Sequence, residues 1–290
     1  MNRKLNLVYT PKAQQGFMGP DHTARALMSR EFPQTDPFII LMDDFLDKKD
    51  NTPVGGPHPH AGFETVSLVL EGEIGEGEYK MRAGDFQIMT AGSGVVHTET
   101  INKKARMRLL QMWITLPDQF RWVSPRLQHL SLRDVPVVTD NGSNIRVYSG
   151  LFAGMASPVD NYVPLIVADI VMEPGTEAKH SLPAHFNTFL YVIEGEVKVG
   201  EERKPLKKDQ VGWLDKSSRQ SQSELLLEAG DSETRIILYS AEPQHVNIVS
   251  HGPFIANTDD EIRGLYKKFR EGRMSHVHTL PEERLIVLGA

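Results

Sequence analysis

The chain contains the segment Phe63-Glu64-Thr65-Val66-Ser67-Leu68-Val69-Leu70-Glu71-Gly72-Glu73, a run of apolar and β-branched residues that stops at a glycine. The same pattern returns 123 residues later as Phe186-Asn187-Thr188-Phe189-Leu190-Tyr191-Val192-Ile193-Glu194-Gly195-Glu196. Such runs, ended by a glycine turn, are typical of buried strands. Because the strand recurs at a constant offset, the sequence predicts two similar β-domains.

Short apolar runs between turn signals continue on both sides of this repeat. They occupy residues 38–42, 109–114, 165–168 and 235–239. This spacing favours antiparallel sandwiches or barrels over alternating β–α units. The turn-rich region around residues 134–144 is the expected junction, so we predict one domain over residues 1–135 and a second over residues 136–290.

One helix is expected near the C-terminus. Thr258-Asp259-Asp260-Glu261 has the pattern of a capping box, and apolar residues follow it at helical spacing. These are Ile262, Leu265, Tyr266 and Phe269. The fold class predicted from the sequence is therefore all-β with a short C-terminal helix that packs its apolar stripe on a sheet.

Two polar pairs flank the first copy of the repeat. His58 and His60 precede it, and His97 and Glu99 follow 37 residues later, after a glycine-rich turn. In an extended strand, side chains at positions i and i+2 point to the same face. Imidazole nitrogens and carboxylate oxygens are good ligands for divalent transition metals. If two strands place the pairs around one point, they form a mononuclear metal site with two octahedral positions open.

The second copy of the repeat provides an internal comparison. At the same offset, His58 falls on Ser181 and His60 falls on Pro183, while the apolar strand residues are kept. Residues needed by a scaffold should occur in both halves, whereas residues needed by a site can occur in one. The comparison indicates that the histidines serve a site and that the second domain lacks it.

Other candidate residues receive structural interpretations. His276 and His278 are interpreted as part of a polar surface tail without partners, and His22 as an isolated histidine that is structural or exposed. Trp113 is interpreted as a packing residue. The acidic stretch with Asp43, Asp44 and Asp47 is interpreted as a polar loop.

Composition excludes several classes of protein. The net charge of −6 and pI near 6.0 argue against direct nucleic-acid binding, which normally needs a basic surface. The absence of cysteine excludes disulfides and thiolate ligands. The sequence shows neither a signal-peptide pattern nor an apolar run of membrane-spanning length. The expectation is a cytoplasmic, monomeric protein that does not contact membranes.

The chain resembles the pirin family of the cupin superfamily. Residues 56–67, with Gly-Pro-His-Pro-His-Ala-Gly-Phe-Glu-Thr-Val-Ser, and residues 89–99 are similar to the two motifs of the family. Residues 252–258 are similar to a stretch common near its C-terminus. The resemblance implies two cupin-type (jelly-roll) β-barrels, a metal-binding cupin over residues 1–135 and a cupin without metal ligands over residues 136–290.

The resemblance also assigns the ligands and the metal. It places the metal on His58, His60, His97 and Glu99, with Glu64 as a second candidate or an outer partner. Iron, as Fe(II), is the expected ion, although manganese, nickel, copper and zinc accept the same donors.

Two functions follow from the resemblance and stay open. The first is a quercetin 2,3-dioxygenase-like oxidoreductase that cleaves a flavonol or another small aromatic or enol substrate with O2. In that enzyme Glu99 is the catalytic base. The second is an iron-bearing redox sensor, without catalysis, that binds a transcription factor or an enzyme complex as its protein partner.

Overall fold

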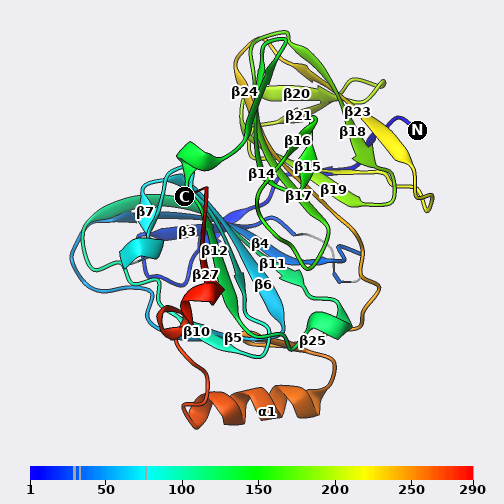
Figure 1. The fold of residues 1–290 in the computed structure, drawn as a ribbon. Helices are drawn as coiled ribbons and strands as arrows, with labels where there is room; N and C mark the ends of the chain where they lie inside the picture. The colour runs from blue at the N-terminus through cyan, green and yellow to red at the C-terminus, as the bar shows by residue number, and fades with distance from the viewer. Residues whose placement is uncertain (29–30, 33, 76, 290) are drawn as a thin grey trace. The chain divides into compact units, whose positions relative to one another are not determined.

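The computed structural model describes residues 1–28, 31–32, 34–75 and 77–289. Strands make up most of the secondary structure, and one α-helix, α1 (Asp259–Arg270), lies near the C-terminus (Figure 1). The predicted all-β architecture with a short C-terminal helix is confirmed. The contacts divide the chain into two compact units, which we call the site unit (residues 12–134 and 244–290) and the second unit (residues 1–11 and 135–243).

The site unit is built on an eight-stranded sheet. The order of its strands is β2 (Ala13–Gln15), β3 (His22–Ala26), β4 (Phe38–Lys48), β11 (Ala105–Thr115), β6 (Phe63–Glu71), β9 (Phe86–Thr90), β12 (Arg126–Leu130) and β27 (Leu285–Leu288). Three two-stranded sheets pair β5 (His58–His60) with β10 (Val95–His97), β7 (Glu73–Ile74) with β8 (Met81–Arg82), and β25 (Val249–His251) with β26 (Phe254–Ala256). Short 3-10 turns are η1 (Gly77–Tyr79), η2 (Asp118–Phe120), η3 (Leu132–Asp134), η4 (Val277–Thr279) and η5 (Glu282–Arg284).

The second unit has a seven-stranded and a four-stranded sheet. The first runs β1 (Leu5–Tyr9), β22 (Val211–Leu214), β19 (Asn187–Glu194), β24 (Thr234–Ala241), β17 (Leu165–Met172), β14 (Ser143–Ser149) and β13 (Val137–Asp140). The other runs β18 (Glu177–Pro183), β23 (Gln222–Ala229), β20 (Glu196–Val199) and β21 (Lys204–Lys207), and a hairpin joins β15 (Leu151–Phe152) to β16 (Met155–Ala156). Its core is a cluster of aliphatic side chains from these strands.

The predicted repeat is visible in the topology. Strand β6 lies between β11 and β9, and β19 lies between β24 and β22, so the two copies hold equivalent positions. Each ends at a glycine with positive φ, 76° at Gly72 and 75° at Gly195. A Cβ at Gly72 would come within 2.0 Å of the Arg106 carbonyl oxygen, which explains why the turn needs glycine.

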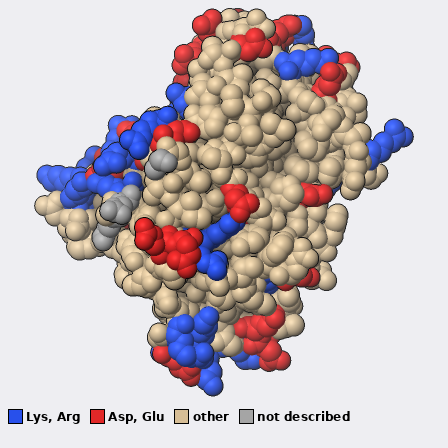
Figure 2. All heavy atoms as spheres, in the orientation of Figure 1, with Lys and Arg blue, Asp and Glu red and all other residues tan. Residues whose placement is uncertain are grey.

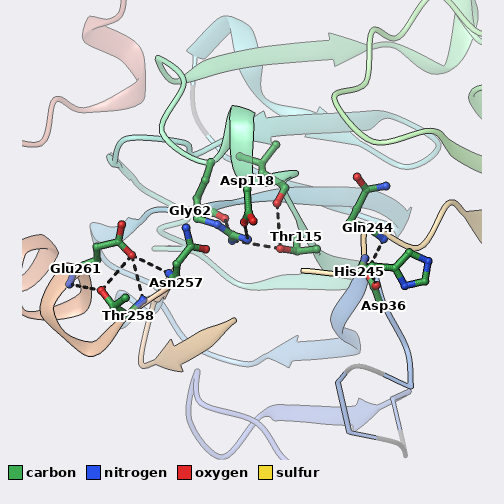
Figure 3. Close-up of polar contacts among 11 residues, drawn as sticks. Asp36, Gly62, Thr115, Asp118, Gln244, His245, Asn257, Thr258 and Glu261 are labelled. Atoms are coloured by element: carbon green, nitrogen blue, oxygen red, sulfur yellow. Dashed lines mark hydrogen bonds and ion pairs between the residues drawn. The ribbon is translucent and has the colours of Figure 1, made fainter. Parts of the chain in front are cut away.

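The chain ends do not follow the predicted contiguous halves of 1–135 and 136–290. Strand β1 pairs with β22 and so belongs to the second unit, whereas β27 pairs with β12 in the site unit. Asp36 fixes the point where the chain re-enters the site unit, because its carboxylate accepts the backbone N–H of Gln244 over 3.0 Å and of His245 over 2.7 Å (Figure 3). Which unit each chain end joins depends on strand pairing between segments that are distant in sequence, so local sequence patterns do not predict it.

Helix α1 has the predicted capping box. The Thr258 hydroxyl accepts the backbone N–H of Glu261 over 3.2 Å, and the Glu261 carboxylate accepts the backbone N–H of Thr258 over 3.0 Å (Figure 3). Ile262 and Leu265 are buried in a cluster with β26, as expected. Phe269 differs from the prediction, because it is 37% exposed and lies outside the buried stripe.

The acidic stretch predicted as a loop lies within strand β4. Asp43 is buried there because the Arg108 guanidinium on β11 donates two hydrogen bonds to it, both of 2.9 Å.

Over the face drawn in Figure 2, acidic and basic side chains of the described residues form small mixed groups. Within the described ranges, no helix combines the length and the apolar character needed to cross a membrane.

Candidate metal centre

Two short antiparallel strands, β5 and β10, bring His58, His60 and His97 together, whereas Glu99 follows the end of β10. Their register sets His97 directly opposite His58. Because side chains alternate along a strand, His60 shares the face of His58. The turn after β5 is held by the buried guanidinium of Arg121, which donates to the Gly62 carbonyl over 3.1 Å (Figure 3). The turn that follows β5 is therefore held in place by a buried side chain.

The three imidazoles converge on one point. The Nε2 atom of His97 lies 2.7 Å from Nε2 of His58 and 3.1 Å from Nε2 of His60. Each of the three residues offers a ring nitrogen that lies within 4.8 Å of the others. Nδ1 of His58 lies 2.9 Å from the Gly56 carbonyl oxygen, and a hydrogen bond donated there leaves the lone pair on Nε2.

These spacings fit a metal ion. Two nitrogens bound at about 2.1 Å and at right angles lie about 3.0 Å apart, whereas tetrahedral angles would separate them by about 3.4 Å. The observed 2.7 and 3.1 Å are close to these separations between ligand atoms of one ion. The donor set therefore suits a transition metal ion.

Burial keeps His60 and His97 neutral. Burial, with the neighbouring His58, lowers the pKa of His97 to about 3. Burial, with His97 and His58 nearby, also places the pKa of His60 well below its usual range. A neutral imidazole is the form that ligates a metal, so binding an ion near neutral pH requires little proton release from these two side chains.

Glu99 lies beside the three histidines without joining their group. Its Oε2 atom is 3.9 Å from Nε2 of His58, while its Oε1 atom accepts a hydrogen bond of 2.9 Å from Nε2 of Gln111. Burial raises the pKa of Glu99, with His58 and Gln111 acting in the opposite direction. One carboxylate oxygen is thus held by Gln111, and the other faces the histidines.

Glu64, the second candidate, lies on β6 and is 2% exposed. Its Oε1 atom accepts a hydrogen bond of 2.6 Å from the Thr90 hydroxyl on β9, and β6 and β9 pair at these two residues. Its carboxylate is therefore engaged within the main sheet, which suits an outer, supporting role.

The C-terminal His276-Val277-His278 segment is not a tail without partners, so that interpretation was wrong. Strand β10 is bonded to it, because the backbone N–H of Val96 donates to the Ser275 carbonyl over 2.9 Å. Nε2 of His276 lies 2.9 Å from the hydroxyl of Thr98, which stands between His97 and Glu99 in the chain. The segment therefore braces the ligand strand, a contact that no local spacing reveals.

Replacing His276 by alanine is expected to weaken metal binding about tenfold, because outer partners orient the ligands. Competition with a chelator measures the dissociation constant, and circular dichroism reports the fold. His251→Ala is the matched control, since His251 is an exposed histidine hydrogen-bonded to Tyr266 on the same unit. Equal metal affinity in the two variants would contradict a bracing role for His276.

A cavity of about 780 Å³ opens on the centre. His58, His60 and Glu99 line it together with Gln111 and Trp113 of β11. The Trp113 ring meets the His60 ring edge-on at 5.2 Å. The sequence predicts a packing role for Trp113 and no role for Gln111, because neither residue belongs to a motif, yet both line the cavity.

The second unit holds no comparable cluster of His, Asp or Glu ligand atoms among the described residues. Its strands β18 and β23 pair in the way that β5 and β10 do, with Ser181 and Pro183 at the positions that the repeat assigns to His58 and His60. The structure thus places the histidine cluster in one unit.

Two antiparallel β-domains, one with three converging histidines, define a bicupin with a centre suited to a metal ion. Residues 21–114 match the family described as Pirin, and residues 167–275 match the family described as Pirin C-terminal cupin domain. The chain belongs to the pirin family, and the predicted cupin-type barrels are thereby confirmed.

Similarity to known proteins extends over most of the chain. Pirin of Homo sapiens is 30% identical over 288 residues, which cover 94% of this chain and 94% of that protein. A crystal structure of quercetin 2,3-dioxygenase from Acinetobacter baumannii aligns with a TM-score of 0.81 at 27% identity, over 95% of this chain and 99% of the other. GK1651 from Geobacillus kaustophilus aligns with a TM-score of 0.77 at 32% identity, over 85% and 99% of the two chains.

Proposed function

We propose that this protein is a metal-dependent dioxygenase of the quercetin 2,3-dioxygenase type, which cleaves a flavonol or a similar enol with O2 at a mononuclear iron. The observation that carries the proposal is the convergence of three imidazole nitrogens beside a carboxylate, at a cavity of about 780 Å³. Cavities of this size accept small organic ligands. The similarity to the Acinetobacter baumannii quercetin 2,3-dioxygenase supports the choice of reaction.

In this proposal His58, His60, His97 and Glu99 hold the metal. Iron(II) suits nitrogen and carboxylate donors with open positions, and manganese, nickel, copper or zinc could bind the same set. When bound, the ion supplies Lewis acidity and a template for substrate and O2.

Glu99 is the proposed catalytic base. Glu99 lines the cavity, and its Oε2 atom lies 3.9 Å from Nε2 of His58, whereas Oε1 is held by the Gln111 amide. Oε2 takes the proton of the enol hydroxyl once that oxygen is released from the ion, because a free carboxylate oxygen can act as a general base. Gln111 orients the carboxylate and so fixes which oxygen acts.

The remaining walls orient the substrate and limit water. Ile40 and Met42 of β4 and the Trp113 ring give the cavity an apolar lining next to the polar ligands. An aromatic substrate packs against such a surface and displaces water from it. The carboxylate of Glu99 then acts in a site of low polarity, where its interactions are stronger than in bulk water.

Oxygen uptake after addition of quercetin to the iron-loaded protein tests the proposal. Uptake that depends on quercetin, stops when a chelator removes the iron, and matches the loss of the flavonol absorbance is expected. Elemental analysis of the same sample gives the metal content, with about one ion per chain expected for a mononuclear centre.

Retention of the metal with no oxygen uptake would overturn the dioxygenase proposal. In that case the iron-bearing regulator becomes the better hypothesis, because a stable centre without turnover is what a redox sensor requires. A preparation that binds no divalent metal at all would contradict both.

A further inference from the structure

A buried histidine–aspartate pair lies beside the metal cavity. Nε2 of His22 on β3 is 2.8 Å from Oδ1 of Asp44 on β4, and the two side chains are 0% and 6% exposed. The Asp44 side chain also lines the cavity. Asp44 lies in a strand, so its interpretation as part of a loop was wrong, whereas His22, predicted to be structural or exposed, is buried and bonded to Asp44.

The same histidine holds the turn between β2 and β3. The backbone N–H of Met18 donates to Nδ1 of His22 over 3.1 Å, and that of Gly16 donates to the His22 carbonyl over 2.8 Å. Since Nδ1 accepts, Nε2 carries the proton and donates it to Asp44. A Cβ at Gly16 would lie 2.1 Å from Nδ1, so the imidazole fills the space that any larger residue would need.

Phe17 is the residue that this turn presents. Its side chain is 76% exposed, which leaves a large apolar ring in water. The ring is nonetheless supported, because it meets the His22 ring edge-on at 5.4 Å. It lines the same cavity as His58, His60 and Glu99. An exposed aromatic ring held at a cavity gains most when a ligand covers it.

We propose that Phe17 is a specificity-determining residue, an aromatic platform that packs on a flat ring of the substrate, and that His22 and Asp44 are positioning residues for it. The inference rests on the proposed function for the substrate class alone. The support runs from the Asp44 carboxylate through the His22 ring to the Phe17 turn, and each of these contacts is internal to the site unit. Packing of one aromatic ring on another accounts for roughly three- to tenfold in affinity.

Binding of quercetin to the metal-loaded protein without oxygen tests this platform apart from turnover. Quenching of tryptophan fluorescence reports binding, because Trp113 lines the cavity. Phe17→Leu is expected to weaken quercetin binding about three- to tenfold, whereas Phe17→Tyr keeps it. Dihydroquercetin has the same hydroxyl groups on a puckered ring, so its binding should change less. Phe269→Leu, at an exposed phenylalanine of α1, is the matched control and should bind as the parent does.

A double-mutant cycle tests the positioning residues. His22→Gln and Asp44→Asn are each expected to weaken quercetin binding in the parent protein, and to add no further loss when Phe17 is already leucine. Metal content should stay equal in all variants. Additive losses would show that the pair acts independently of Phe17 and would overturn the positioning role.

The outcomes separate this inference from the proposed function. Quercetin binding that is insensitive to Phe17→Leu, or no preference of the parent for quercetin over dihydroquercetin, overturns the platform. Tight, Phe17-dependent binding without oxygen uptake supports the platform and overturns the dioxygenase. Absence of quercetin binding overturns the platform as well, because the flat ring is what it is proposed to select.

Discussion

His97→Ala is expected to leave the protein without its metal ion and without oxygen uptake. Nε2 of His97 is the central donor, since it lies 2.7 and 3.1 Å from the Nε2 atoms of His58 and His60. Sites with four protein ligands bind zinc with about 10–16 kcal/mol, so one ligand accounts for about 3 kcal/mol, or a loss of more than ~100-fold in affinity. Elemental analysis after dialysis and a chelator competition measure this loss.

The control for His97→Ala is His129→Ala. His129 is a buried histidine on β12 of the same unit and contacts Gln87 and Ser131. Its loss should affect the unfolding temperature and leave the metal content unchanged. If His97→Ala retained a full equivalent of metal at unchanged affinity, three converging imidazoles would not be the metal centre, and the proposed function would lose its basis.

Local sequence patterns were enough to predict the strands and their repeat. Strands β6 and β19 correspond to the apolar runs that end at Gly72 and Gly195, and they hold equivalent positions in their sheets. Each strand depends mainly on the burial of its apolar side chains and on a glycine turn, and both features can be read from about ten residues of sequence. The exchange of chain ends was different, because β1 and β27 pair with strands far away in sequence, and the choice depends on the complete sheet.

The candidate site divides in the same way. His58, His60 and His97 were predictable because two i, i+2 pairs on neighbouring strands must meet when those strands pair. His276-Val277-His278 has the same spacing, yet its last two residues begin a 3-10 turn, and its role comes from a contact with Thr98. The sequence around His22 did not indicate its role either, since its partner Asp44 is 22 residues away and lies on the neighbouring strand.

Glu99→Gln is expected to lower kcat per bound metal ion by about 10²–10⁴-fold, and also to weaken metal binding because the amide is a poorer ligand than the carboxylate. The amide keeps the size of the side chain and its contact with Gln111, but it cannot accept the proton of the enol hydroxyl. The three histidines still supply their donors, so rates expressed per bound metal ion separate loss of the base from loss of the ion. Initial rates of oxygen uptake, taken with the metal content of each sample, measure the effect.

Glu64→Gln is the comparison that makes the Glu99 result specific. Glu64 is also a buried carboxylate of the site unit, but its Oε1 atom is bonded to the Thr90 hydroxyl on the main sheet. The neutral amide can still accept that hydrogen bond, so metal and turnover should be largely retained. The reverse result, with turnover lost in Glu64→Gln and kept in Glu99→Gln, would transfer the base to Glu64. It would also imply that the 3.9 Å approach of Glu99 to His58 is a structural contact without a catalytic role.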